Sequence, residues 1–278
     1  MASTRVLDSR DTVLPVFEQF REELDDHNDR RERLIKSSRD VTNLSKKVIF
    51  LLHRIVTDDA GEFDDKIGRH AAARAKGKFR EIQSLFAAMC PELAGERFAR
   101  YQRNVSPGLQ EYIEALSFAH YLEHKSLISY DQVQQSLCDD DGIPYFPLPL
   151  EDYLLGLSDL TGELMRFAIA SISRRGGRQK ASDVCSFVRA CKADFERLTP
   201  YYRELRKKQH VTAQSLEKIE DAAYAVAVRT SEFDLPPEML DDLVAQAVSH
   251  AADHSGFGDE PRRKRARNAE YGDLDDDL

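Results

Sequence analysis

The stretch TVLPVFEQFREELDDHNDRRERLIKSSRDVTNLSKKVIFLLHRIV, residues 12–56, contains no glycine and one proline, Pro15. A helix accepts proline in its first turn, because the amide hydrogen that proline lacks would have no partner inside the helix there. Apolar residues fall along the stretch on a stripe of three- and four-residue spacings, as on one face of a helix. They include Phe17, Phe20, Leu24, Leu34, Val41, Val48, Leu52 and Ile55.

This first helix is expected to be longer than one compact domain. A helix of roughly 40 residues measures about 60 Å, at about 1.5 Å per residue. We therefore expect part of it to pack against a partner or against a long neighbouring helix.

The rest of the sequence predicts further helices and no strand, because no segment shows the alternation of a half-buried strand. Ser129 followed by Gln132 is a capping box that starts one short helix. A loop rich in aspartate and proline is expected over residues 139–149. The predicted helices cover about residues 62–90, 91–127 with a kink or restart at 106–108, 129–138, 151–173, 181–208, 212–230 and 237–252. The sequence therefore predicts an all-α bundle with a very long first helix.

Composition restricts the function classes. The 278 residues are 41% hydrophobic and carry a net charge of −9, which repels nucleic acid as a whole. Any RNA or DNA binding must therefore come from local basic patches or from a partner. The four cysteines show no paired metal spacing and read as reduced thiols. The chain has no apolar leader, no apolar run of 18 residues and no Walker A, GxGxxG, GxSxG or CxxC motif. We expect a soluble protein that is not secreted and does not bind membranes.

Two acidic pairs are the main candidate site. Glu111 and Glu114 are spaced i,i+3, and Asp159 and Glu163 are spaced i,i+4, so each pair shares one helical face. Both segments are otherwise apolar, so four carboxylates between two packed helices would repel one another without a cation among them. Mg²⁺ prefers oxygen ligands and keeps some water, and it is the metal we expect here. The alternative is that the acids line solvent faces or pair with Arg and Lys.

Two basic segments are candidate RNA-binding surfaces. Residues 66–80 carry six Lys or Arg residues, one His and no acid. Arg97, Arg100 and Arg103 recur every three residues beside Tyr101, just before the first acidic pair. Such a line could hold a phosphate backbone while the aromatic ring stacks on a base. The alternative is a solvated helix face.

His120 and His124 match the HxxEH pattern of inverted zinc peptidases. Three short residues make a permissive motif, and no third ligand follows in a suitable setting. An amphipathic helix face is the better interpretation.

The domain organisation follows from composition. We expect residues 1–10 to be disordered, a helical domain over residues 11–252, and a disordered tail over residues 253–278, which has few apolar residues to offset the entropy of ordering. The tail contains a basic cluster typical of a nuclear-import signal, which predicts a protein of nucleus and cytoplasm. A solvated polyelectrolyte tail is the alternative. The cluster consists of Arg262, Arg263, Lys264, Arg265 and Arg267.

Four segments together resemble the translin family, in its translin-associated factor X branch. They are SRDVTNLSKKVIFLLHRI (38–55), GLQEYIEALSF (108–118), DYLLGLSDLTGELMRFAI (152–169) and YAVAVRTSE (224–232). The similarity covers about residues 11–240 in the same order. Translin itself lacks the acidic pairs, so their presence favours the factor X branch. The basic cluster departs from the family pattern, because in relatives it is expected near the N-terminus.

This resemblance implies a seven-helix fold that assembles with translin into a closed hetero-octamer. It also implies a Mg²⁺-dependent endoribonuclease whose catalytic acids and metal ligands are Glu111, Glu114, Asp159 and Glu163. The implied substrates are single-stranded RNA, including siRNA passenger strands and tRNA-processing fragments, with single-stranded DNA as a further candidate ligand. Metal-bound water would attack the phosphate after a neighbouring carboxylate takes its proton.

Two other functions stay open from the sequence. The first is a non-catalytic helical scaffold that stabilises translin and assists nucleic-acid binding. The second is an all-α nucleotide pyrophosphohydrolase, which also uses a Glu-x-x-Glu pair with a distant acidic pair around Mg²⁺. In that class the second pair is usually spaced by two residues, whereas three residues separate Asp159 from Glu163.

Overall fold

The computed structural model describes residues 9–58, 65–172 and 177–232, which form seven α-helices and no β-strand. The predicted all-α fold is therefore confirmed. The helices are α1 (Ser9–Asp58), α2 (Asp65–Leu93), α3 (Arg97–His124), α4 (Tyr130–Gln135), α5 (Leu150–Ile172), α6 (Gly177–Leu198) and α7 (Arg203–Glu232).

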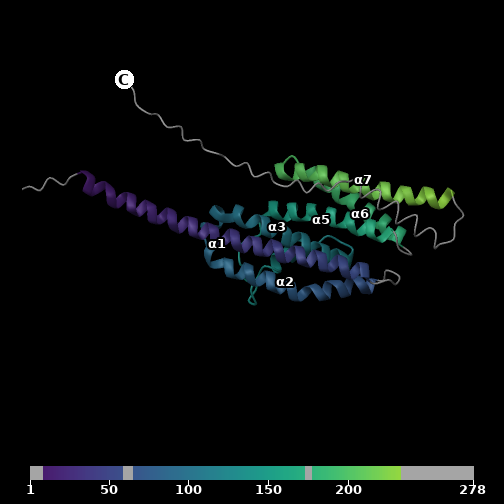
Figure 1. The fold of residues 1–278 in the computed structure, drawn as a ribbon, viewed down its shortest axis with the longest axis horizontal. Helices are drawn as coiled ribbons and strands as arrows, with labels where there is room; N and C mark the ends of the chain where they lie inside the picture. Colours follow the sequence, from purple (N-terminus) through teal and green to yellow (C-terminus); the bar gives the residue numbers. More distant parts are fainter. Residues whose placement is uncertain (1–8, 59–64, 173–176, 233–278) are drawn as a thin grey trace, which may run out of the picture.

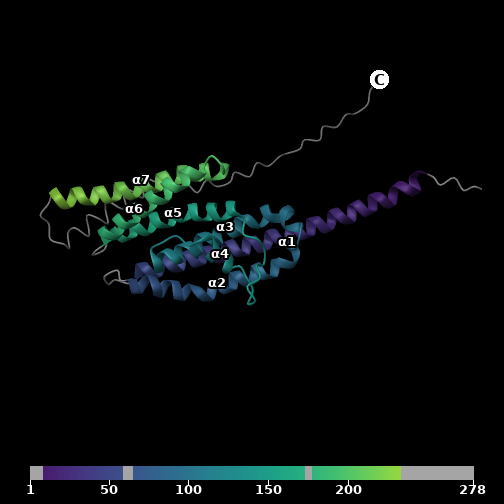
Figure 2. The same ribbon diagram turned by 180° about the vertical axis from the view of Figure 1, so that it is seen from behind.

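The long helices form two groups of three. Helices α1, α2 and α3 pack on one another, and so do α5, α6 and α7. The two groups meet chiefly where α3 lies against α5, as both views of the ribbon show (Figures 1 and 2). The ring of Phe118 on α3 lies 6.3 Å from that of Phe167 on α5, edge to face. The contact between α3 and α5 is therefore the junction of the fold.

Helix α1 confirms the very long first helix, with 50 residues. Its buried residues begin at Leu34, and from there it packs against α2 and α3. Before Leu34, His27 still contacts Tyr101 of α3 and Arg30 still pairs with Glu92 of α2. The part of α1 before these contacts extends beyond the other helices (Figure 1), and it exposes Phe17, Phe20 and Leu24. That a partner covers this apolar stripe stays a prediction.

The predicted restart of the helix at residues 106–108 is wrong, because α3 continues through Pro107. Proline removes one hydrogen bond from a helix interior, and α1 supplies local replacements. The amide of Gly108 donates to Ser38 Oγ at 3.1 Å, and that hydroxyl donates to the carbonyl of Val105 at 3.3 Å. A neighbouring helix thus supports the site where the sequence alone suggests a break.

The predicted boundary at residues 208–212 is also wrong. Helix α6 ends at Leu198 and α7 begins at Arg203, so the chain turns at Pro200. Proline lacks the amide donor that would continue the helix. Lys208 and Gln209 consequently lie inside α7, on the side that faces α5.

Several predictions fall on residues that the structure does not describe. They are the N-terminal residues before Ser9, the helix over 237–252, the tail over 253–278 and its basic cluster. Among the described helices, none combines the length and apolar character that a membrane span requires.

Two glycines of α5 give a matched test of the junction. A Cβ on Gly156 would lie 2.7 Å from Ile113 Cβ and 2.9 Å from the carbonyl oxygen of Gln110, whereas a Cβ on Gly162 would meet no atom within 4 Å. We expect Gly156→Ala to lower the free energy of unfolding by about 1–3 kcal/mol, because α3 must move. Gly162→Ala should raise it by up to about 1 kcal/mol through helix propensity. Urea unfolding measures both, and equal stability of the two variants would contradict the close contact.

Candidate functional site

The structure brings the two acidic pairs to the junction of the fold. Glu111 and Glu114 lie on α3, and Asp159 and Glu163 lie on the adjoining α5. Glu163 is buried and the other three acids are half-buried. The packing of α3 against α5 thus shields these carboxylates from water only in part.

The four acids influence one another electrostatically. Burial, followed by the charges of Asp159, Glu163 and Glu111, raises the pKa of Glu114 to about 9. Burial also raises the pKa of Glu111, to which Asp159 and Glu163 add. The charges of the two pairs therefore act on one another, although the pairs are far apart in the sequence.

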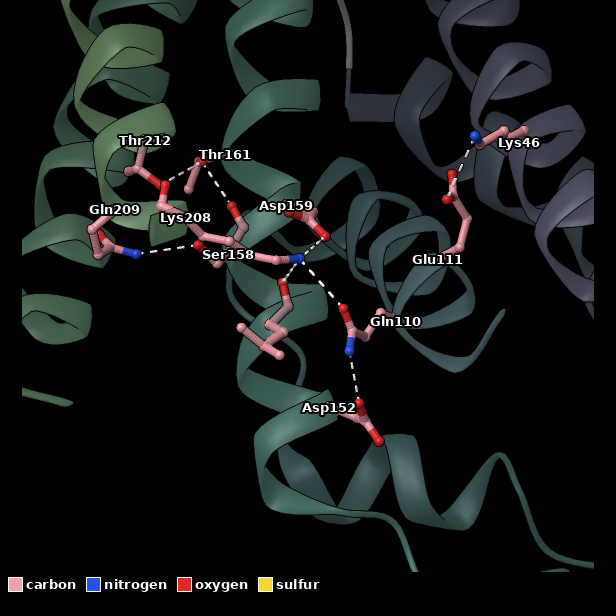
Figure 3. A network of polar contacts seen from close by, with 11 residues as sticks. Lys46, Gln110, Glu111, Asp152, Ser158, Asp159, Thr161, Lys208, Gln209 and Thr212 are labelled. Carbon is pink, nitrogen blue, oxygen red and sulfur yellow. Dashed lines mark hydrogen bonds and ion pairs between the residues drawn. The ribbon is translucent and has the colours of Figure 1, made fainter. Parts of the chain in front are cut away.

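Basic side chains from three helices balance three of the acids. Lys46 Nζ on α1 lies 3.8 Å from Glu111 Oε2, and Lys208 on α7 contacts the Asp159 carboxylate (Figure 3). His53 on α1 lies 2.7 Å from Glu163 Oε2, and Arg166 Nη1 lies 2.5 Å from Glu163 Oε1.

Glu114 differs from the other acids, because its carboxylate makes no ion pair or hydrogen bond within residues 9–58, 65–172 and 177–232. Helix α3 therefore presents one acid with a partner and one without.

The pKa directions follow from these contacts. Burial raises the pKa of Asp159, although the charge of Lys208 and its hydrogen bond oppose the rise. Burial acts in the same direction on Glu163, but the hydrogen bond from His53 and the charge of Arg166 outweigh it and lower the pKa. Glu163 is thus the best-compensated carboxylate of the set.

The donor chemistry fits a hard divalent ion, because all four side chains offer carboxylate oxygens. The placement of the side chains, however, does not yet fit such an ion. Across the described part of the chain, no three His, Cys, Asp or Glu side chains lie close enough together to hold an ion. Two of the acids are held by other side chains instead: Asp159 contacts Lys208, and Glu163 contacts His53 and Arg166. At least one acid must leave its basic partner before these residues could surround an ion.

A polar network surrounds Lys208 (Figure 3). Besides Asp159, its ammonium group lies 3.3 Å from the carbonyl oxygen of Leu155 and 3.4 Å from Gln110 Oε1. The amide nitrogen of Gln110 in turn donates to Asp152 Oδ1 at 2.7 Å. Lys208 therefore joins α7 to both acid-bearing helices.

Sequence reasoning missed Lys46, His53 and Lys208. The first two are seven residues apart on one face of α1, a spacing that could have indicated a shared role. For Lys208 no such signal exists, because the predicted helix boundary fell at that residue. Its role depends on the packing of α7 against α5.

That the line of arginines binds RNA stays a prediction, and the aromatic ring beside it is not available. Arg97, Arg100 and Arg103 are exposed along α3. Tyr101 is only 4% exposed, and its hydroxyl contacts His27 of α1. The ring of Tyr101 therefore cannot stack on a base in this structure.

The remaining sequence motifs lie away from the acids. The basic residues of segment 66–80 are mostly exposed on α2. The rings of His120 and His124 lie 4.5 Å apart, without a third ligand among the described residues. The basic cluster of residues 262–267 lies outside the described residues.

Comparisons with known proteins agree with the fold and with the family resemblance. The translin family pattern matches residues 29–230. Translin-associated protein X of Rattus norvegicus is 36% identical over 257 residues, which cover 84% of each chain. The translin-associated protein X homolog of Schizosaccharomyces pombe is 30% identical over 78% of this chain and 89% of its own. Translin of Homo sapiens is 24% identical over 78% of this chain and 94% of its own.

Solved structures share the fold. AfC3PO in complex with duplex RNA has a TM-score of 0.57 at 18% identity, over 79% of this chain and 99% of that chain. Apo-NeC3PO has a TM-score of 0.56 at 20% identity, over 74% and 94%. The predicted resemblance is confirmed, and the chain belongs to the translin family.

Proposed function

We propose that this chain is the Mg²⁺-dependent endoribonuclease subunit of a hetero-oligomer with translin, and that it cleaves single-stranded RNA. The observation that carries the proposal is Glu114, a half-buried carboxylate without a basic partner whose pKa is raised by the charges of three further acids as well as by burial. The relatives named translin-associated protein X and the AfC3PO complex with duplex RNA support it. An octamer is the assembly that we expect.

The residues that would hold Mg²⁺ are Glu111, Glu114, Asp159 and Glu163. When bound, the ion would supply a Lewis acid that lowers the pKa of water and neutralises charge on a phosphate oxygen. A carboxylate of the same set would then serve as the acceptor for a proton of water. A Cβ on Gly162 would meet no atom within 4 Å, so α5 leaves space next to Asp159 and Glu163.

One observation favours a second function, the non-catalytic scaffold. Three of the four acids already have basic partners, as in a purely structural charge network. In that case the acids would stabilise the junction between α3 and α5 without binding a metal. The variants Glu114→Gln and Asp159→Asn, described next, distinguish the nuclease from the scaffold.

The first prediction concerns cleavage. Glu114→Gln and Asp159→Asn should each lower the rate of RNA cleavage at least about 100-fold, because each removes a charged ligand, and they should leave assembly intact. Cleavage of end-labelled single-stranded RNA is measured in Mg²⁺ and in EDTA, with the chain co-purified with translin. The exposed Glu217→Gln on α7 is the control. Wild-type activity in both variants would favour a nuclease elsewhere, and inactive wild type would favour the scaffold.

The second prediction concerns pH. The pKa of Glu114 is raised from 4.5 to about 9 in the folded chain. The wild type therefore loses stability as the pH rises from about 4.5 towards about 9, whereas a glutamine stays neutral. In EDTA, the Tm of Glu114→Gln should rise relative to wild type between pH 5 and pH 8.5, by about 2–4 °C for each kcal/mol. A Tm difference that does not change with pH would contradict the raised pKa; Glu217→Gln again serves as control.

The third prediction concerns Lys208. Lys208→Met should bind Mn²⁺ at least about fivefold more tightly by calorimetry, because a neighbouring unit charge is worth about 1 kcal/mol even in water. The same variant should be less stable in EDTA, since Asp159 loses its partner. Lys207→Met is the matched control, because Lys207 pairs with Glu204 instead. Unchanged Mn²⁺ affinity would show that Lys208 does not compete with metal ions.

A further inference from the structure

We propose that the exposed face of α1 beside the acids is a binding platform for single-stranded RNA, with Phe50 as the residue on which a base stacks. The inference rests on the proposed nuclease function and adds the surface that holds its substrate. We call this surface the α1 platform; its residues are Lys36, Arg39, Lys46, Lys47, Phe50 and Arg54.

Helix geometry places the α1 platform next to the acids. Lys46, Phe50 and Arg54 follow one another at i,i+4 spacing, so they line one face of α1. Lys46 contacts Glu111, and His53, three residues after Phe50, contacts Glu163. Phe50 therefore lies about one helical turn from two side chains that contact the acid set.

The charge of the α1 platform suits a phosphate backbone. Six charged side chains are exposed between residues 36 and 57, and five of them are basic; the exception is Asp40. Within the described part of the chain, Lys36, Arg39, Lys47 and Arg54 make no ion pair. The whole chain carries a net charge of −9, so this face is a local basic surface on an acidic protein. Such a surface attracts polyanions over short distances.

Phe50 supplies an exposed aromatic ring on which a base can stack, which the basic side chains alone do not offer. It is 69% exposed, although Val48, Ile49 and Leu52 beside it are buried. A single exposed apolar residue is common, but an aromatic ring among basic side chains is the arrangement that binds unpaired bases. Tyr101, which the sequence suggested for this role, is buried. Phe50 also favours unpaired over duplex RNA, because stacking needs a base face that pairing conceals.

The experiment measures RNA binding, and one variant makes use of the absence of tryptophan from this chain. Full-length chain co-purified with translin is titrated with a labelled 12-nucleotide oligouridylate in EDTA, so that Mg²⁺-dependent cleavage does not interfere. Phe50→Ala should bind about tenfold more weakly, as expected for one lost stacked base. In Phe50→Trp, the indole fluorescence above the wild-type background should be quenched on binding. Lys47→Ala with Arg54→Ala should reduce the slope of log K against log salt by about 0.7 per lost contact.

Two variants are matched controls. Tyr201 is an aromatic residue that is 79% exposed in the turn between α6 and α7, outside the α1 platform, so Tyr201→Ala should bind normally. Arg197 is an exposed arginine of α6, and Arg197→Ala should leave the salt slope unchanged.

The outcomes separate this inference from the proposed function. Normal binding by Phe50→Ala overturns the α1 platform, even when Glu114→Gln abolishes cleavage and the nuclease function stands. A changed molar mass of the Phe50→Ala complex in light scattering also overturns it, because Phe50 would then be a subunit contact. Weakened binding by Phe50→Ala supports the α1 platform, even when cleavage proves independent of Glu114.

Discussion

Four carboxylates at the contact between α3 and α5 are the constraint around which the rest of the structure is arranged. This contact joins the two groups of helices, and it leaves Glu163 buried and the other three acids half-buried. Carboxylates in such a place need positive charge, because burial penalises the ionised form. Helix α1 contributes Lys46, α5 contributes Arg166 and α7 contributes Lys208, and His53 of α1 adds a hydrogen-bond contact to Glu163. The helices on both sides of the junction therefore serve its charge balance as well as its packing.

The same arrangement relates the two proposed functions physically. A structural charge network and a metal site place the same demand on the fold, which is to keep carboxylates together despite their repulsion. Glu114 distinguishes them, because a purely structural network has no reason to leave one half-buried carboxylate without a basic partner. The pKa of Glu114 is raised because burial and the neighbouring acids disfavour its ionised form and no direct basic partner offsets them.

Much of the fold was predictable from local sequence. The long first helix followed from residues 12–56, where nothing interrupts a helix, and the acids from their spacing on two apolar helices. The wrong predictions arose where a contact with a residue far away in the sequence determines the local structure. Pro107 predicted a break, but Ser38 from another helix supports the backbone there. Tyr101 looked available to a base until α1 covered it. Lys208 could not be assigned to the site, because only the packing of α7 brings it to Asp159.

The position of Lys208 in the chain has a consequence for biosynthesis. The helices that carry the acids leave the ribosome before α7, so Asp159 is made well before the cation that balances it. Helices α1, α2 and α3 can already pack while α5 still lacks that partner, because their mutual contacts involve no later residue. The charge balance of the site is complete only after nearly the whole helical body has been synthesised. A chain that stops before Arg203 would therefore keep all four acids and lose the means of holding one of them.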